Sequence, residues 1–308
     1  MYAENEFPLP ASQQGVSSMI EQDRKMGLPN TPQVKKVITQ AIAEDLSQGD
    51  VTTEALIPKT QQGKASIVVK ANGILAGVEV AKQVLLKVDP ELKIAILIED
   101  GTEVKPGDIV AKIEGRVVSI LKAERVASNF LQHLSGIATE TNHYVQAVKG
   151  LPVQITDTRK TTPCLRTLGK YAVRVGGGKN HRMNLGDGIL IKDNHLAALH
   201  HQGLSIKEIV IKARQKASPE LKIEVEVKTT QEAVEAVEAG ADIIMLDNMG
   251  LEDMRQAVQL IKGRALIEAS GGITLDRVRA VAETGVDLIS IGALTHSAKA
   301  LDISLELD

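Results

Sequence analysis

Basic residues are concentrated in one stretch of the chain, between Asp157 and His195. These 39 residues contain eight of the 36 Lys and Arg residues but only three acids, which gives the stretch a charge of about +5 in a chain of net charge −3. The stretch also holds three consecutive glycines, Gly176 to Gly178, and lacks a ladder of aromatic residues. Positive charge concentrated in this way predicts a pocket for a small, highly anionic substrate.

Polar residues and glycines follow the buried strands that the pattern of apolar residues predicts. In a parallel barrel the active site lies at the carboxyl ends of the strands, so these residues are the candidates for chemistry. The predicted strands are 153–157, 188–195, 223–227, 242–248, 265–271 and 287–293, and the residues at their ends are Asp157, Thr158, Arg159, Lys160, Lys192, Asp193, Asn194, His195, Asp247, Asn248, Ser270, Gly271, Gly272 and Gly292.

The strand IEVEV carries two acids that point the same way. Glu224 and Glu226 alternate with Ile223, Val225 and Val227, so both carboxylates face the barrel interior if the apolar face packs on the outer helices. Buried carboxylates need Lys or Arg partners or a metal ion to offset their desolvation. The alternation therefore predicts a functional role for this strand.

Two glycine-containing turns follow the last two strands. One is Ser270-Gly271-Gly272 and the other is Gly292-Ala293. Glycine lets backbone N–H groups approach an anion, and loops after the late strands of such barrels often bind phosphate. Together with the earlier cations, the two turns predict a phosphate site.

Possible metal ligands are few. Glu226 and Asp247 suit Mg²⁺ or sugar hydroxyls, because Mg²⁺ prefers one or two carboxylates with substrate phosphate completing its shell. His181 and His195 are too few, and lie among too many cations, for a structural zinc site. Cys164 lies among cations, but no base is placed beside it by the sequence, so a nucleophilic role is not expected.

The second half of the chain has the rhythm of alternating strands and helices. AVEAGADIIMLDN and VAETGVDLISIGA match at an offset of 45 residues, each with a Gly that ends a helix (Gly240, Gly285) and an Asp before the strand (Asp242, Asp287). Six predicted strands, with no G-x-G-x-x-G after the first, favour a barrel of six to eight strands over an open dinucleotide-binding sheet.

The first half predicts a smaller α+β domain. An amphipathic helix from Thr31 to Leu46 is followed by short strands at 65–71 and 92–100, whereas residues 1–30 show no sustained period and are expected to be a mobile extension. The single cysteine excludes an intramolecular disulfide, and no secretory signal or apolar run of about 20 residues is found. A cytoplasmic protein is expected, and the acidic net charge argues against nucleic acid as the main partner.

The strings DTRKTTPCLR, KYAVRVGGGKNHRMNL and LIKDNH resemble the quinolinate phosphoribosyltransferase family. The resemblance extends from about residue 34 to the C-terminus and includes AERVASNFLQHLSGIAT, EVEV, IMLDN, EASGGIT and ISIGALTHSAKALDISL. Where the family string often reads TTPGLR, this chain has Cys164, which puts only the local turn in doubt.

The resemblance implies an α/β fold with two domains and a returning C-terminus. The expected parts are the extension (1–30), an α+β open-faced sandwich (31–130), a (β/α) barrel of seven strands (131–293) and a segment that packs back on the first domain (294–308). It also implies a homodimer, or a higher oligomer built from it, in which Arg125 reaches the partner's active site.

The resemblance further implies an enzyme that joins quinolinate to the phosphoribosyl group of phosphoribosyl pyrophosphate, with loss of CO₂ and with Mg²⁺ as its cofactor. Catalysis is expected from Lys160, Glu226 and Asp247, with Mg²⁺ near the two acids. The dicarboxylate is assigned to Arg125, Arg159, His181, Arg182 and Lys192, and Lys160 is expected near the phosphoribosyl group. Glu226 and Asp247 would hold the ribose hydroxyls, and the phosphate cradle is assigned to Ser270, Gly271, Gly272 and Gly292. Thr158 and Ala293 are also expected to bind substrate. The other basic residues, Arg166, Lys170, Arg174 and Lys179, are expected on a solvated surface.

Two other classes of protein stay open at this point. One is a different phosphate-binding barrel enzyme, such as an aldolase that forms a Schiff base through Lys192. The other is a non-catalytic, anion-binding relative on the same scaffold.

Overall fold

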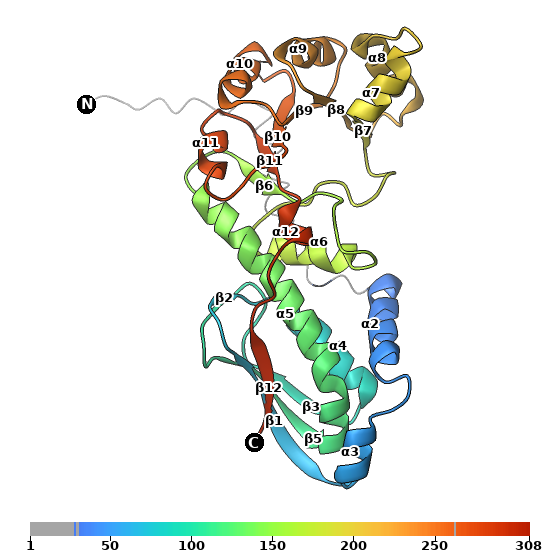
Figure 1. The fold of residues 1–308 in the computed structure, drawn as a ribbon, viewed down its shortest axis with the longest axis vertical. Helices are drawn as coiled ribbons and strands as arrows, with labels where there is room; N and C mark the ends of the chain where they lie inside the picture. Colours follow the sequence, from blue (N-terminus) through green and yellow to red (C-terminus); the bar gives the residue numbers. More distant parts are fainter. Residues whose placement is uncertain (1–27, 29–30, 262) are drawn as a thin grey trace, which may run out of the picture.

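The computed structural model describes residue 28, residues 31–261 and residues 263–308. They form two parts stacked along the long axis of the molecule and joined by the helix α5 (Val117–Ala147), as Figure 1 shows. One part is built on an antiparallel sheet and the other on a parallel sheet. The mobile extension expected at residues 1–30 lies outside the described residues, apart from Leu28.

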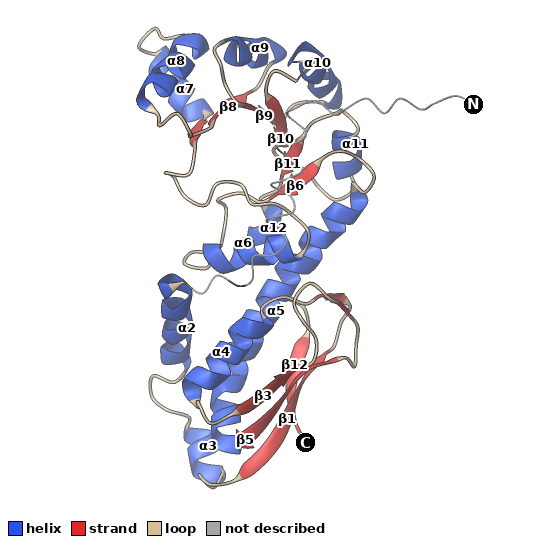
Figure 2. Cartoon of the chain, turned by 180° about the vertical axis from the view of Figure 1, so that it is seen from behind, coloured by secondary structure: helices blue, strands red, loops and turns tan. Residues whose placement is uncertain are grey.

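The first part is an open-faced sandwich with helices on one face of its sheet (Figure 2). Ala65, Ile67 and Val69 alternate with more exposed residues along one strand, so this face carries the apolar side chains that the helices cover. The four-stranded sheet has the order β12-β1-β5-β3. Its strands are β1 (Gln62–Val69), β3 (Lys93–Ile96), β5 (Ile109–Arg116) and β12 (Ile303–Leu307); β2 (Gly73–Ile74) pairs with β4 (Glu103–Val104), and the helices are α2 (Pro32–Asp45), α3 (Val51–Leu56) and α4 (Val78–Val88).

The helix predicted at residues 31–46 is confirmed as α2. Thr31 caps its N-terminus by accepting the N–H of Val34 at 3.3 Å, and Pro32 occupies the first turn, where it costs no hydrogen bond. The strand predicted at 92–100 is shorter: after Ile96 the N–H groups of Leu97 and Ile98 both donate to Val110 O, at 2.8 and 3.2 Å, which ends the regular ladder. Asp100, further on, accepts the N–H groups of Gly77 and Val78 at the start of α4.

The second part contains the six predicted strands in one parallel sheet. In the order β6-β11-β10-β9-β8-β7, the first strand (β6) pairs with the last (β11), while β6 and β7, which are consecutive along the chain, lie at opposite edges of the sheet, as in an opened barrel. The strands are β6 (Gln154–Thr156), β7 (Ile189–Ile191), β8 (Ile223–Val227), β9 (Ile243–Asp247), β10 (Leu266–Ser270) and β11 (Leu288–Ser290). The helices are α6 (Arg166–Val175), α7 (Asp193–His200), α8 (Ile206–Lys216), α9 (Thr230–Glu238), α10 (Leu251–Ile261), α11 (Val278–Ala282) and α12 (Ala293–His296).

The barrel-like fold is therefore confirmed, but the expected count of seven strands is not. Beyond β6 the sheet continues as a single parallel bridge between Thr156 and Lys179 in the described residues. There the N–H of Lys179 donates to Ile155 O at 2.8 Å and the N–H of Asp157 donates to Lys179 O at 3.1 Å.

The repeat at an offset of 45 residues has a structural cause. Asp242 and Asp287 each accept, at 2.8 Å, the N–H of a residue on the preceding strand, Ile223 and Ile267 respectively. Each carboxylate thus ties the start of one strand to its neighbour, and the same Gly-x-Asp turn is used twice.

The helix α5 joins the two parts without a linker. It runs through residue 130, where the sequence suggested a domain boundary. The C-terminal segment crosses α5 at Gly136, where a Cβ would collide with the carbonyl of Lys299. Gln132 bonds to both sides of this crossing, since its carbonyl accepts the N–H of Leu301 at 3.0 Å and its Nε2 donates to Ile303 O at 2.6 Å. No helix in the described part is both long enough and apolar enough to span a membrane.

Cys164 lies in a turn that favours glycine. The N–H of Leu165 donates to Thr162 O at 3.1 Å, Pro163 is the second residue of the turn, and Cys164 is the third, with φ 64°. A type II turn requires a positive φ at its third position. The departure from TTPGLR thus leaves the turn in place with a strained residue.

Replacing Cys164 by Gly is expected to raise the free energy of unfolding by up to about 1 kcal/mol. The left-handed conformation costs a residue with a Cβ roughly 1–2 kcal/mol, and the larger entropy of Gly in the unfolded chain offsets part of the gain. Because Cys164 is exposed, no packing is lost. Urea unfolding measures the change; Cys164→Ala keeps the Cβ, and an equal gain in that variant would contradict the explanation.

Candidate functional site

The carboxyl ends of the parallel strands bring two acids together. Glu226 lies on β8 and Asp247 ends the neighbouring strand β9. Burial raises the pKa of Glu226, and the negative charges of Asp247 and Asp193 raise it further, whereas Lys192 acts in the opposite direction. Two acids that repel each other in this way favour a bound cation or hydroxyl donors between them.

The turn after β10 approaches the acids closely. Gly271 and Gly272 have φ values of 93° and 58°, and a Cβ on Gly271 would collide with the side chain of Asn248. Asn248 itself has φ 55°, and its Nδ2 donates to Asp247 Oδ1 at 3.0 Å. Asn248, one of the strand-end candidates, thereby joins one acid to the Ser270-Gly271-Gly272 turn.

The second glycine turn meets a cation. A Cβ at Gly292 would lie 3.1 Å from Cδ of Lys160 and 3.2 Å from Nε2 of His296, so glycine leaves room for both side chains. Thr295 fixes the backbone there, because its Oγ1 donates to Lys160 O at 2.9 Å. Thr158 supports the same segment by accepting the N–H of Lys160 at 3.0 Å. His296 was not predicted, since a single His four residues after a glycine carries no sequence signal.

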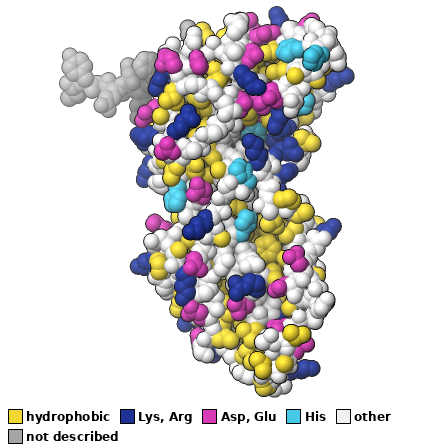
Figure 3. All heavy atoms as spheres, in the orientation of Figure 1, with side chains coloured by type: hydrophobic (Ala, Val, Ile, Leu, Met, Phe, Trp, Pro, Cys, Tyr) yellow, Lys and Arg dark blue, Asp and Glu magenta, His cyan; other side chains and the backbone are white. Residues whose placement is uncertain are grey.

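Two arginines on the loops between β6 and β7, Arg159 and Arg182, influence each other through their charges. Burial lowers the pKa of Arg182, and so does the positive charge of Arg159. Nε of Arg159 is buried and has no hydrogen-bond partner in the described residues, whereas Nη1 of Arg182 donates to Gly188 O at 3.2 Å. Figure 3 shows Lys and Arg side chains gathered over the loops between α6 and β7. Cations whose charges repel each other in this way favour a bound anion.

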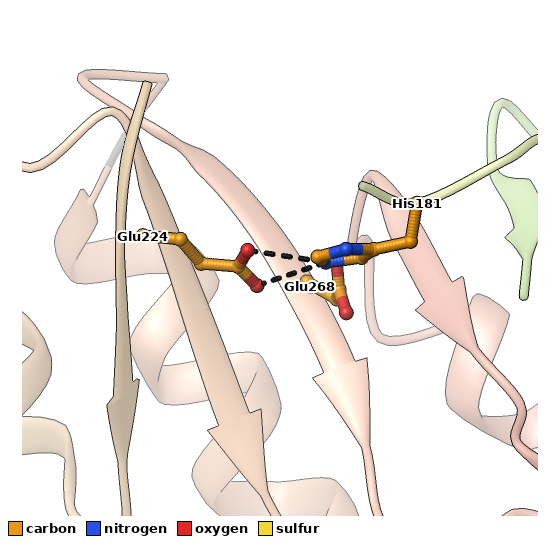
Figure 4. Close-up of side chains that lie close together, drawn as sticks. All are labelled: His181, Glu224 and Glu268. Carbon is orange, nitrogen blue, oxygen red and sulfur yellow. Dashed lines mark hydrogen bonds and ion pairs between the residues drawn. The ribbon is translucent and has the colours of Figure 1, made fainter. Parts of the chain in front are cut away.

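His181 does not project freely toward a ligand but reaches two glutamates. Its Nε2 lies 3.1 Å from Oε2 of Glu224 and 3.5 Å from Oε2 of Glu268, and Figure 4 shows the imidazole from a loop meeting the two carboxylates from β8 and β10. The predicted partner for Glu224 was Lys, Arg or a metal ion; the structure provides a histidine. Glu268 was missed, although its alternation with Ser270 along β10 places both on one face, the signal that identified Glu224 and Glu226.

This trio is also the one group of three His, Cys, Asp or Glu side chains, among the described residues, that could share a metal ion. Glu226 and Asp247 do not belong to such a group. Among the described residues, a cation beside them would therefore have these two carboxylates as its ligands from the protein. Such a pair fits Mg²⁺, which commonly takes one or two carboxylates and fills its shell with substrate oxygens and water.

The expectation that Lys170 is solvated is wrong. Its side chain is completely buried and forms an ion pair with Asp157, which is also completely buried. Nζ of Lys170 donates further to His181 O at 2.9 Å, and Asp157 accepts the N–H of His181 at 2.9 Å. A charge count along the sequence cannot distinguish such a residue from a surface lysine, because the acid that neutralises it lies 13 positions away.

Arg166 and Arg174 also differ from the expected solvated surface. Arg166 donates to Thr161 Oγ1 at 3.1 Å and to Met183 O at 3.1 Å, and so braces the two loops that carry the other cations. Arg174 stacks over the ring of Tyr171, with its guanidinium carbon 5.9 Å from the ring centroid. The hydroxyl of Tyr171 donates in turn to Asp100 at 2.6 Å and links α6 to the first part of the chain.

Lys192 and Arg125 are exposed, unlike these buried groups. Lys192 is exposed at the start of α7. Arg125 lies on the first third of α5, beside the antiparallel sheet, with 62% of its side chain exposed and its guanidinium 3.4 Å from the neighbouring Glu124. The other predicted residues meet at one edge of the parallel sheet, but within this chain Arg125 does not join them.

Comparisons with known proteins identify relatives along most of the chain. A family model described as "Quinolinate phosphoribosyl transferase, N-terminal domain" matches residues 50–135, and the corresponding C-terminal domain model matches residues 137–306. The chain is 44% identical over 278 residues to a probable nicotinate-nucleotide pyrophosphorylase [carboxylating] of Bacillus subtilis, covering 90% of this chain and 94% of that one. It is 43% identical to the chloroplastic nicotinate-nucleotide pyrophosphorylase [carboxylating] of Arabidopsis thaliana, covering 90% and 84%.

Solved structures agree with this result. The crystal structure of NadC from Streptococcus pyogenes superposes with a TM-score of 0.87 at 44% identity, covering 92% of this chain and 99% of that one. The structure of the nicotinate-nucleotide pyrophosphorylase from Francisella tularensis gives a TM-score of 0.85 at 37% identity, with the same coverage.

The glutamates around His181 predict a pH-dependent stability. Burial alone would lower the pKa of His181, but Glu224 and Glu268 outweigh it and raise this pKa to about 10. Because the unfolded value is about 6.5, the stabilisation is complete below that pH and is lost as pH rises toward 10, with a slope of at most about 1.4 kcal/mol per pH unit. The difference in free energy of unfolding between the wild type and His181→Gln, measured by urea at pH 6.5, 8 and 9.5, should therefore shrink; a constant difference would contradict the shift.

Proposed function

Because the chain belongs to the quinolinate phosphoribosyltransferase family, we propose that it joins quinolinate to the phosphoribosyl group of phosphoribosyl pyrophosphate. The products are nicotinate mononucleotide, CO₂ and pyrophosphate. The observation that carries the proposal is the buried and unpartnered Nε of Arg159, whose charge acts on Arg182, in a site that also holds the acids Glu226 and Asp247 at the strand ends. A dicarboxylate and a phosphorylated sugar need these two kinds of group side by side.

The guanidinium groups would bind the pyridine dicarboxylate. Quinolinate has two adjacent carboxylates, and each can take a charge-assisted, bidentate hydrogen bond from one arginine. Arg159 and Arg182 are assigned this role, with Lys192 adding positive charge and His181 forming the floor of the pocket. Binding there would orient the ring nitrogen toward the sugar.

The phosphoribosyl group would lie between the acids and the glycine turns. Backbone N–H groups of Ser270, Gly271 and Gly272 can approach the 5′-phosphate, and so can those of Gly292 and Ala293. Thr158 is assigned to the same substrate, while Lys160 is placed by Gly292 to face the departing pyrophosphate.

Catalysis would follow from this arrangement. As the bond from C1′ to pyrophosphate breaks, positive charge develops on the sugar, and the carboxylates of Glu226 and Asp247 stabilise it while they hold the ribose hydroxyls. Mg²⁺ bound near these acids would neutralise part of the pyrophosphate charge. The ring nitrogen then bonds to C1′, and the positively charged ring accepts the electron pair that the adjacent carboxylate leaves when it departs as CO₂; a proton completes the product.

The two remaining sequence alternatives are less well supported. A Schiff-base lysine is usually buried so that its amine is neutral, and Lys192 is exposed. A non-catalytic anion-binding protein would not need Glu226 and Asp247 beside its anion site. Quinolinate-dependent release of pyrophosphate from phosphoribosyl pyrophosphate in the presence of Mg²⁺ separates the three, since an aldolase would instead be trapped by borohydride and a binding protein would release nothing. The cytoplasmic location stays a prediction.

We further propose a homodimer in which Arg125 completes the partner's pocket. Its exposed position on α5, away from the other cations of its own chain, supports this assignment. A two-fold axis would bring the Arg125 of each chain to the active site of the other.

Replacing Arg182 by Ala should lower kcat/KM for quinolinate by about a hundredfold or more, because one charge-assisted pair to a carboxylate is lost in a partly dry site. Lys160→Ala should lower kcat by a similar factor. Initial rates of pyrophosphate release measure both effects. Lys216→Ala, on the far end of α8, serves as the control; wild-type rates in either site variant would refute the assignment.

Mixed dimers test the role of Arg125. Arg125→Ala and Lys160→Ala chains should each be nearly inactive alone, but a mixed dimer restores one intact site out of two, so random exchange of subunits gives about one quarter of the wild-type rate. The rate is measured after the two variants are mixed and allowed to exchange. Absence of any recovery, with exchange verified by mass spectrometry, would place Arg125 outside the shared site.

A further inference from the structure

We infer that Glu268 is a positioning residue of the dicarboxylate pocket: together with Glu224 it holds the imidazole of His181, and through it the guanidinium of Arg182. The inference rests on the proposed function, because it assigns Arg182 to quinolinate. Glu268 is not among the candidate site residues that the sequence predicted.

The burial of Glu268 is the first reason. Its side chain is completely buried inside the parallel sheet, and neither of its oxygens has a hydrogen-bond partner among the described residues. Its nearest opposite charge is Nε2 of His181 at 3.5 Å. A buried carboxylate with so few partners destabilises a barrel interior, where an aliphatic side chain would serve folding at least as well. A role in the site accounts for its presence better than a role in the fold.

The anchoring of His181 is the second reason. Its N–H donates to Asp157 Oδ1 at 2.9 Å, its carbonyl accepts from Lys170 at 2.9 Å, and its Nδ1 accepts the N–H of Arg182 at 2.8 Å. In the neutral ring, where Nδ1 is the acceptor, the ring proton lies on Nε2, which faces Glu224 and Glu268. All four polar atoms of His181 are therefore bound, and the backbone of Arg182 is fixed by the ring that the glutamates hold.

The charges around the imidazole are the third reason. Glu224 faces it from β8 and Glu268 from β10, while Asp157 and Lys170 bind its backbone and Arg182 and Arg159 lie above. Two carboxylates face a single imidazole, so the trio carries a net negative charge. That charge offsets part of the repulsion between the two arginines without occupying their donors, which stay available for the substrate.

The test is Glu268→Gln, which keeps the shape of the side chain and removes its charge. KM for quinolinate should rise by about tenfold while KM for phosphoribosyl pyrophosphate changes by less than about twofold, and the alkaline limb of kcat/KM should move to lower pH. Glu268→Asp should restore part of the quinolinate KM and of the alkaline limb. Glu252→Gln, which removes an exposed carboxylate from α10, controls for the change in net charge.

A second measurement does not depend on activity. In the wild type, ¹⁵N NMR of the His181 ring should show the change from the imidazolium to the neutral ring, with Nε2 protonated in both, near pH 10, and in Glu268→Gln this change should occur at lower pH. If the wild type releases no pyrophosphate, the proposed function fails, while the NMR titration still decides whether Glu268 controls His181.

Three results would overturn the inference. The first is an unchanged quinolinate KM and alkaline limb in a folded Glu268→Gln protein. The second is an equal rise in both KM values, which indicates general damage. The third is one equivalent of a divalent cation in purified wild type that is absent from Glu268→Gln, because Nε2 would then be a metal ligand and not a donor to the carboxylates.

Discussion

The buried ion pair between Asp157 and Lys170 is the interaction on which the site depends. It joins the end of β6 to α6, and the same two side chains hold the backbone of His181 from both sides. Asn180 adds a third donor to Asp157 at 2.6 Å. Removing one member of such a pair leaves an uncompensated charge, which typically costs about 3–5 kcal/mol. The loop from residue 179 to residue 182 therefore has one conformation, and the cations that follow it are placed before any substrate arrives.

This arrangement explains how a cationic pocket can exist in a folded protein. Arg159 and Arg182 repel each other, and neither is neutralised by a direct ion pair in the described residues. The negative trio of His181, Glu224 and Glu268 lies beneath them inside the sheet and supplies the compensating charge at a distance. The interior thus gives up part of the apolar packing usual in a parallel barrel and gains a preorganised site, in which little reorganisation is needed when a dianion binds.

Local patterns in the sequence were sufficient for the elements and for most of the sheet edge. Alternation and Gly-x-Asp turns predicted all six strands, because a strand buried on both sides must be aliphatic and must start and stop at turn residues. The polar ends of those strands then had to meet, since parallel strands share one carboxyl edge. Glu226, Asp247 and the Ser270-Gly271-Gly272 turn follow from this rule alone.

The contacts between residues far apart in the sequence were decided only by the tertiary structure. The sequence by itself determined which residues are charged and which strand end each one follows, because period and spacing act within a few residues. It could not determine that Lys170 is buried against Asp157, that His181 enters the sheet to meet Glu224 and Glu268, or that Arg125 lies apart from the other cations. Those outcomes depend on contacts across 11 to more than 80 positions, where desolvation and ion pairing in the folded interior, not local propensity, select the partner.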